Sequence, residues 1–339
     1  MQPRLLPSRP INLRQIINWG CTGVMRGRPS ISVVMPLYNK AECVVETLSA
    51  AASQIGAEFE IIVVDDGSKD GSGELVKMAG VPHLRVIEQT NAGVSAARNR
   101  GIAAARGEWI AFLDADDLWS QDHLAGLLQA VEGSDVVAAF SNARLQSRAG
   151  RPTIEPRVSA RRIDDYFSFA LSNGGYPMGT SAIIIRRNQF RAAGLFAEGV
   201  SIGEDVDMWC RLACLGPFFY NAEVSATYND AGSETRGSYG GRAARPVFTQ
   251  RLPDLIRDGK VPPALLESAR RYANFLMLEY ARQLLDAGRY AEARNVLLHE
   301  CFVLYDPGRS LKRLARTTFV GRTLFGLIRG GVRKPSTLG

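Results

Sequence analysis

The chain has 339 residues, enough for one large domain or two of ordinary size, and its 46% hydrophobic and 22% charged residues are typical of a soluble globular protein. Its formal charge of +7 is uneven: residues 260–339 carry 14 Lys and Arg against 6 Asp and Glu, while the remainder is close to neutral. This distribution argues against a general nucleic-acid-binding protein and indicates a C-terminal segment that meets an anionic partner.

Cysteine usage and hydropathy predict a cytosolic protein. The five cysteines lack the paired spacing of a metal finger, so we expect buried free thiols in a reducing compartment. The N-terminus has no apolar core of the signal-peptide type, and no run of about 18 apolar residues occurs. We therefore predict neither a secretory signal nor a transmembrane helix.

Short apolar strands alternate with helices in the first half of the chain. Residues 1–29 are rich in Pro and Arg and are predicted to form a loose extension. Helices are expected between successive strands, over 41–54, 73–79 and 94–105. This alternation predicts right-handed βαβ units and a mostly parallel, Rossmann-like α/β sheet flanked by helices. The predicted strands are residues 31–35, 61–64, 84–87 and 109–113.

The second half is less regular. We predict strands over 135–140 and 181–185 and a helix over 204–215. Residues 229–245 are rich in Gly and Ser and read as a loop. Beyond about residue 262 the chain turns helical. A pair of helices is predicted over 272–287 and 290–299.

The predicted strand 109–113 opens onto three carboxylates within four residues, Asp114, Asp116 and Asp117. Like charges packed this closely repel one another, and a divalent cation best explains such a cluster at a strand end. Oxygen ligands of this kind suit Mg²⁺ or Mn²⁺. The alternative is a strand end followed by a helix cap at Asp117 or Ser120.

Two further polar segments follow predicted elements. The Asp65–Ser68 corner ends a strand, and a carboxylate of Asp65 or Asp66 there could accept from a nucleobase N–H or a ribose hydroxyl; the alternative is an ordinary Asx-turn. Arg98 lies where a loop enters a helix and could offer its planar fork to phosphate or base; the alternative is a solvated helix.

The Glu204–Asp205 pair opens another predicted helix. One of these carboxylates could act as a general base toward an incoming hydroxyl, whereas the alternative is favourable interaction with the helix dipole.

In parallel sheets, ligands bind outside the carboxyl ends of the strands. We therefore expect segments 36–39, 65–68 and 114–117 to converge on one cleft.

The joint order of these motifs is more specific than any one of them. A strand ending in DDGS is followed by NAGVSAARNRG, then GEWIAFLDADD, and later GEDVDMW. This order resembles the inverting family-2 glycosyltransferases with the GT-A fold. The resemblance runs from about residue 31 to residue 228 and is strongest over 31–119.

The resemblance implies a nucleotide-sugar site. Asp114 and Asp116 match the family's D-x-D motif, with Asp116 as the direct metal ligand, and the cofactor would be Mg²⁺ or Mn²⁺. Asp205 matches the catalytic base, with Glu204 beside it and Trp209 shaping the acceptor pocket. The positions expected to bind the nucleotide sugar are Pro36, Tyr38, Asp65, Asp66, Arg98, Asp114 and Asp116.

The predicted activity is nonprocessive transfer of a sugar, from a UDP-sugar in our expectation, to a saccharide acceptor in surface glycan biosynthesis. The Gln-x-x-Arg-Trp motif of processive synthases is missing after the Glu-Asp motif. A sugar nucleotidyltransferase or a dinucleotide-dependent oxidoreductase would need glycines after the first strand, and residues 36–40 (PLYNK) have none. A catalytically inactive nucleotide-sugar-binding or scaffold protein stays open as the alternative.

The C-terminal tail is basic and amphipathic. Residues 307–339 contain eight Lys and Arg and no acidic residue, with apolar side chains interspersed. Such segments lie on anionic membranes, although a helix packed on the protein's own core is the alternative. We expect a peripheral protein on the cytosolic face of the plasma (inner) membrane, with a lipid-linked acceptor. The expected units are an N-terminal extension (1–29), a GT-A domain (30–235), a helical region (236–306) and the tail (307–339).

Overall fold

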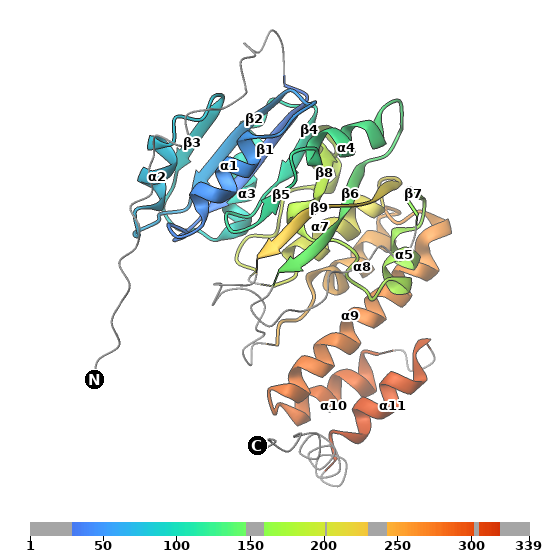
Figure 1. Cartoon of the computed structure of the whole chain (residues 1–339). Helices are drawn as coiled ribbons and strands as arrows, with labels where there is room; N and C mark the ends of the chain where they lie inside the picture. Colours follow the sequence, from blue (N-terminus) through green and yellow to red (C-terminus); the bar gives the residue numbers. More distant parts are fainter. Residues whose placement is uncertain (1–28, 147–158, 201, 230–242, 302–304, 319–339) are drawn as a thin grey trace, which may run out of the picture.

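The computed structural model describes residues 29–146, 159–200, 202–229, 243–301 and 305–318. They form a nine-stranded sheet with helices on both faces, and a helical region that extends from one end of it (Figure 1). The predicted α/β fold class with a helical C-terminal extension is therefore confirmed. The predicted extension over 1–29 lies outside the described residues except for Pro29, as does most of the predicted loop 229–245.

The first half of the sheet is parallel, as predicted. Strands lie in the order β3–β2–β1–β4, and each neighbouring pair is parallel. Helices connect them as crossovers, which confirms the βαβ units. The elements are β1 (Ile31–Leu37), α1 (Val44–Ala52), β2 (Phe59–Asp65), α2 (Ser72–Met78), β3 (Leu84–Glu88), α3 (Val94–Ala104) and β4 (Trp109–Phe112).

The second half of the sheet is mixed. Strand β8 is antiparallel to both β4 and β6, while β6 and β9 are parallel to each other. Strands β5 and β7 pair antiparallel with β9. The sheet is thus parallel over its first four strands and mixed beyond them. These strands are β5 (Leu118–Trp119), β6 (Ala138–Gln146), β7 (Arg161–Ile163), β8 (Ile183–Arg186) and β9 (Phe218–Asn229).

Two hydrophobic cores cover the two faces of the sheet. In β1, Val34 belongs to one core, whereas Val33 and Met35 belong to the other. Successive side chains of a strand point to opposite faces, so a strand covered on both sides is apolar throughout. One core includes α1, α2 and α4 (His123–Val131), and the other includes α3, α5 (Tyr166–Ser172), α6 (Phe190–Ala193) and α7 (Glu204–Ala213).

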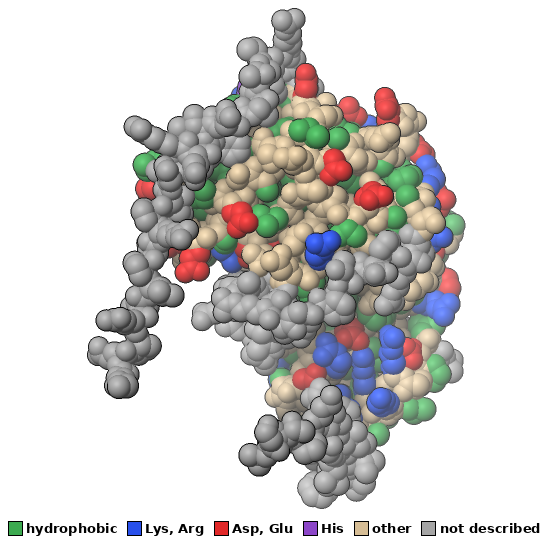
Figure 2. Space-filling model, in the orientation of Figure 1, with side chains coloured by type: hydrophobic (Ala, Val, Ile, Leu, Met, Phe, Trp, Pro, Cys, Tyr) green, Lys and Arg blue, Asp and Glu red, His purple; other side chains and the backbone are tan. Residues whose placement is uncertain are grey.

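The helical region contributes to one core of the sheet and also forms a separate core of its own. Helix α9 (Leu266–Asp286) contributes Tyr272 to the core beneath α5, and its C-terminal half packs with α10 (Tyr290–His299) in a separate cluster. Helix α8 (Val247–Arg257) lies between α7 and α9. Figure 2 shows Lys and Arg side chains gathered over this region, with acidic residues among them.

The first part of the predicted tail packs on the protein. Helix α11 (Pro307–Ala315) is held to α9, because Arg313 pairs with Glu279 at 2.6 Å and Arg316 with Asp286 at 2.8 Å. Residues 319–339 of the predicted tail lie outside the described residues. Across the described segments, we find no helix with both the length and the apolar character of a bilayer span.

Gly107 provides a test of the packing at the start of β4. A Cβ atom at this position would lie 2.6 Å from the Ser32 backbone nitrogen and 2.7 Å from the Ile31 carbonyl carbon. Because these are backbone atoms, the strands must separate to accept it. Gly107→Ala should lower the free energy of unfolding by about 1–3 kcal/mol, measured by urea denaturation.

Gly126→Ala is the matched control. Gly126 lies within α4, and the nearest atom to its added Cβ is the Asn221 side-chain nitrogen at 3.5 Å. Removing a helical glycine where space allows should raise stability by about 0.5–1 kcal/mol. Equal effects of the two substitutions would contradict the close approach at Gly107.

Candidate active site

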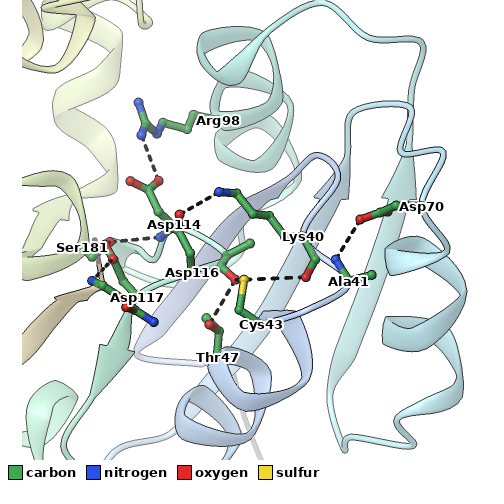
Figure 3. Close-up of polar contacts among 12 residues, drawn as sticks. Lys40, Ala41, Cys43, Thr47, Asp70, Arg98, Asp114, Asp116, Asp117 and Ser181 are labelled. Atoms are coloured by element: carbon green, nitrogen blue, oxygen red, sulfur yellow. Dashed lines mark hydrogen bonds and ion pairs between the residues drawn. The ribbon is translucent and has the colours of Figure 1, made fainter. Parts of the chain in front are cut away.

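Polar residues from four separate segments meet at the carboxyl edge of β1, β2 and β4. They come from the loop after β1, the loop after β2, the turn after β4, and the start of α7. Figure 3 shows the residues around Asp114 and Asp116 in this region. The sequence predicts this convergence for the first three segments, because the parallel order of the first strands brings their carboxyl ends to one edge.

The loops after β1 and β2 are fastened to each other. Asn39, in the left-handed region with φ 50°, donates its backbone N–H to the Ser68 hydroxyl, and its side-chain oxygen accepts from the Lys69 N–H. The Ala41 N–H donates to Asp70 at 2.8 Å. These contacts give the edge a defined shape before any ligand binds.

The predicted nucleoside positions fall into two groups. Pro36 is buried within β1, whereas Tyr38, just beyond the strand, is 45% exposed. Asp65 accepts from the Ser68 N–H at 2.9 Å. Asp66 is buried and accepts three hydrogen bonds of 2.8 Å, from the Gln89 side chain and from two backbone N–H groups of residues 92–93. Asp66 therefore holds the loop before α3 in place, whereas the side chain of Tyr38 lies exposed at the surface.

The three clustered carboxylates point in different directions. Asp117 is fully buried and accepts from the Ser181 hydroxyl at 2.6 Å and from the Asn229 N–H at 3.2 Å. Ser181 also accepts from the Asp114 N–H at 3.0 Å. Asp117 thus anchors the turn from inside, while the cap of α4 is Asp122 rather than Asp117 or Ser120. Sequence analysis missed Ser181, which lies in the 3₁₀ turn Thr180–Ala182 where a strand was predicted.

Asp114 and Asp116 each face a cation of the protein (Figure 3). Asp116 pairs with Lys40, with 2.8 Å between the carboxylate oxygen and Nζ. Asp114 accepts from Arg98 at 2.9 Å. Lys40 was also missed by sequence analysis, because it lies in a turn without any motif spacing toward residue 116.

Arg98 joins the two halves of the site. Its other terminal nitrogen donates to Glu204 at 2.9 Å, and its guanidinium lies 5.5 Å from the centre of the Phe196 ring. Burial alone would lower the pKa of Arg98, but the adjacent Asp114 and Glu204 carboxylates raise it above its ordinary value. We expected Arg98 to offer its planar fork to a ligand; instead, that fork engages two carboxylates of the protein.

The carboxyl of Asp205 has a raised pKa. Burial raises the pKa of its carboxyl from 3.8 to about 6, and the neighbouring Glu204 charge adds to the rise, which Arg98 partly opposes. Its carboxylate accepts from the Val206 N–H at 2.7 Å. Near neutral pH the group is ionised but holds a proton more readily than an ordinary aspartate.

The rest of α7 is anchored in the core. Asp207 is fully buried between Arg211 at 2.9 Å and Arg251 of α8 at 3.2 Å. Trp209 is only 1% exposed and packs edge-on against Phe196, with 6.1 Å between ring centres. Trp209 therefore supports the site from within the core and is not an exposed pocket wall.

The donor set at this edge fits a hard divalent cation only in part. Asp114 and Asp116 offer carboxylate oxygens, which suit Mg²⁺ or Mn²⁺. In the part of the chain that the structure describes, no three His, Cys, Asp or Glu side chains group as a metal site. A cation here would need further oxygen ligands, as a bound diphosphate supplies.

The different roles of the clustered carboxylates can be tested by stability. Asp117→Asn disturbs a buried hydrogen-bond set and should lower the free energy of unfolding by about 1–3 kcal/mol. Asp116→Asn removes a partly exposed ion pair and should cost no more than about 1 kcal/mol. Urea denaturation compares the two. A larger loss for Asp116→Asn would contradict the roles assigned here.

Comparisons with known proteins agree with this geometry. Residues 32–188 match glycosyl transferase family 2. The succinoglycan biosynthesis protein ExoO of Rhizobium meliloti is 37% identical over 124 residues, which cover 36% of this chain and 36% of that protein. The chain thus spans 36–40% of the length of the first curated relatives it matches.

Two solved structures share the fold. S. aureus TarS 1–349, in complex with UDP-GlcNAc, has a TM-score of 0.66 at 18% identity and covers 89% of this chain and 92% of its own. The mannosyltransferase PcManGT from Pyrobaculum calidifontis, in complex with GDP-Man and Mn²⁺, has a TM-score of 0.56 at 22% identity and covers 95% and 92%. These similarities show that the chain has the GT-A fold.

Proposed function

Because residues 32–188 match glycosyl transferase family 2 and the chain has the GT-A fold, we propose that the chain is a nonprocessive, inverting glycosyltransferase. It transfers a sugar from a nucleotide-sugar donor to a hydroxyl of a saccharide acceptor. The observation that carries this proposal is the Arg98 bridge. It holds Asp114, on the donor side, and Glu204, beside the candidate base Asp205, within one hydrogen-bonded unit.

The donor binds at the edge formed by the loops after β1 and β2. Tyr38 offers an exposed ring to the nucleoside, while Asp65 and Asp66 with buried Pro36 hold the surrounding loops. We propose a UDP-sugar as donor, supported by the UDP-GlcNAc complex of the structural neighbour TarS. The GDP-Man complex of PcManGT makes the base of the nucleotide the first property to test.

Asp116, with Asp114 beside it, would hold Mg²⁺ or Mn²⁺ together with the donor diphosphate. When bound, such a cation offsets the negative charge that develops on the departing nucleotide, as a Lewis acid does. Mn²⁺ is present in the PcManGT complex, which supports this choice of cofactor.

Asp205 removes the proton from the acceptor hydroxyl as the hydroxyl attacks the anomeric carbon. A base with a pKa of about 6 is ionised at neutral pH and still basic enough to accept that proton. Glu204 is paired with Arg98, so its charge is compensated and it orients the start of α7. Attack from the side of Asp205, opposite the leaving diphosphate, inverts the anomeric centre.

The acceptor in this proposal is a lipid-linked saccharide of surface glycan biosynthesis, reached at the cytosolic face of the plasma (inner) membrane. The relative ExoO, named for succinoglycan biosynthesis, supports the glycan class. The excess of basic residues in 307–339 supports contact with anionic lipid. Because Arg313 and Arg316 pair with acidic residues of α9, we assign this contact to residues 319–339.

The test of the proposed chemistry begins with a thermal-shift screen of nucleotide sugars, with and without Mn²⁺, to identify the donor. Release of the nucleotide from that donor is then measured against pH. The rate should rise about tenfold per pH unit up to about pH 6 and level off above it, because only ionised Asp205 accepts a proton.

Asp205→Asn should lower this rate by about 10²–10⁴-fold and abolish the rise below pH 6. Its stability at pH 8 should equal or exceed that of the wild type. The raised pKa means that the folded state favours protonated Asp205, so the ionised form opposes folding above that pKa. Asp254→Asn, on the exposed face of α8, is the matched control and should leave the rate unchanged. Nucleotide release that survives Asp205→Asn undiminished would contradict the role of Asp205 as the base, whereas a wild type that binds the donor and releases no nucleotide would support an inactive binding protein.

Deletion of residues 319–339 tests the membrane contact while keeping α11. These residues contain four Lys and Arg and no acidic residue, each basic residue contributing about 1 kcal/mol near an anionic surface. Co-sedimentation with phosphatidylglycerol vesicles at low salt should fall about tenfold or more, with little binding to phosphatidylcholine vesicles in either form. Unchanged co-sedimentation would remove the membrane from the proposal.

A further inference from the structure

Lys40 occupies the position at Asp116 where a cation is expected to bind. The ammonium nitrogen lies 2.8 Å from the Asp116 carboxylate, and the two side chains are 23% and 13% exposed (Figure 3). The backbone beside Lys40 is fixed, because Asn39 is bonded to the loop after β2. The flexible side chain of Lys40 is thus attached to a backbone segment that hydrogen bonds hold in place.

The two cations of the site differ in how easily they can leave. The Arg98 side chain is 4% exposed and holds two carboxylates and an aromatic ring at once. Lys40 is more exposed, and its compact ammonium is readily hydrated. Ligand binding can therefore release Asp116 by moving Lys40, whereas moving Arg98 would leave both Asp114 and the largely buried Glu204 without this partner.

A free divalent cation meets an unfavourable site while Lys40 is in place. It would have to displace the ammonium from Asp116 and would still lie close to that positive charge. Among the described residues, no three acidic, imidazole or thiol side chains group as a metal site that would compensate. A diphosphate changes this balance, because it supplies oxygen ligands to the cation and negative charge to Lys40.

We propose that Lys40 couples the binding of the divalent cation to that of the nucleotide diphosphate. In the free protein Lys40 neutralises Asp116 and disfavours the cation alone. When both ligands arrive, Lys40 leaves Asp116 to the cation and pairs with the diphosphate. This inference rests on the proposed donor site, and it makes Lys40 a positioning residue for the donor complex.

Coupling of this kind is a thermodynamic quantity that can be measured without turnover. If UDP tightens Mn²⁺ binding, Mn²⁺ tightens UDP binding by the same factor. Removing the Lys40 charge should reduce this factor in two ways. The cation alone binds more tightly without the competing ammonium, and the diphosphate loses a positive partner.

The experiment measures Mn²⁺ binding by electron paramagnetic resonance of the full chain, with no ligand, with UDP, and with UMP. In the wild type we expect UDP to tighten Mn²⁺ binding by about 100-fold and UMP, which lacks the second phosphate, by much less. In Lys40→Met we expect tighter binding of Mn²⁺ alone and a UDP effect of only about tenfold.

Two control variants separate charge from general disturbance. Lys40→Arg keeps a positive charge and should retain most of the coupling. Lys260→Met removes a lysine from the exposed pair with Asp258 and should match the wild type. Circular dichroism and melting temperature verify that each variant is folded.

The outcomes distinguish this inference from the proposed function. If the wild type binds Mn²⁺ with UDP and Lys40→Met shows the same coupling, the role of Lys40 is wrong while the donor site stands. If the wild type binds no Mn²⁺ even with UDP, the proposed donor site fails and the role of Lys40 fails with it.

Discussion

The site depends on one buried guanidinium. Arg98 of α3 donates to Asp114, which follows β4, and to Glu204, which opens α7, so a single cation holds two segments that lie far apart in the sequence. A buried arginine is tolerable only when its charge is matched, and here two carboxylates match it. Those carboxylates in turn are fixed in place, while Asp116 pairs with Lys40 and Asp205 follows Glu204 at the start of α7.

The architecture explains why these groups are so close. Four parallel strands bring their carboxyl ends to one edge, and β8 then returns antiparallel beside β4. The 3₁₀ turn before β8 carries Ser181, whose hydroxyl bonds both the Asp114 backbone and the Asp117 carboxylate. Asp117 therefore supports the turn from inside, whereas Asp116 and Asp114, one and three residues before it, are partly exposed and pair with Lys40 and Arg98.

Sequence analysis predicted the parallel half of the fold and the residues at its edge, because four apolar runs, each followed by polar residues, carry that information locally. It missed what depends on contacts between distant segments. The partners of Arg98 and Lys40 are set by three-dimensional proximity, and no spacing rule connects residue 40 with residue 116. Trp209 illustrates the same limit, since its position after the Glu204–Asp205 pair does not reveal that its ring faces the core. Strands β5 and β7 pair with β9, which itself pairs with β6, and the short or half-polar sequences of β5, β7 and β9 carry little periodic signal.

The ion pairs of Asp207 limit how the C-terminal region of this protein can be replaced by that of another protein. Its fully buried carboxylate, one turn of helix after the Glu204–Asp205 pair, is shared by Arg211 of the same helix and Arg251 of α8. The sheet domain and the helical extension therefore share one buried charge and are electrostatically interdependent. A chimera that grafts another C-terminal region onto this domain must bring its own positive side chain to that point.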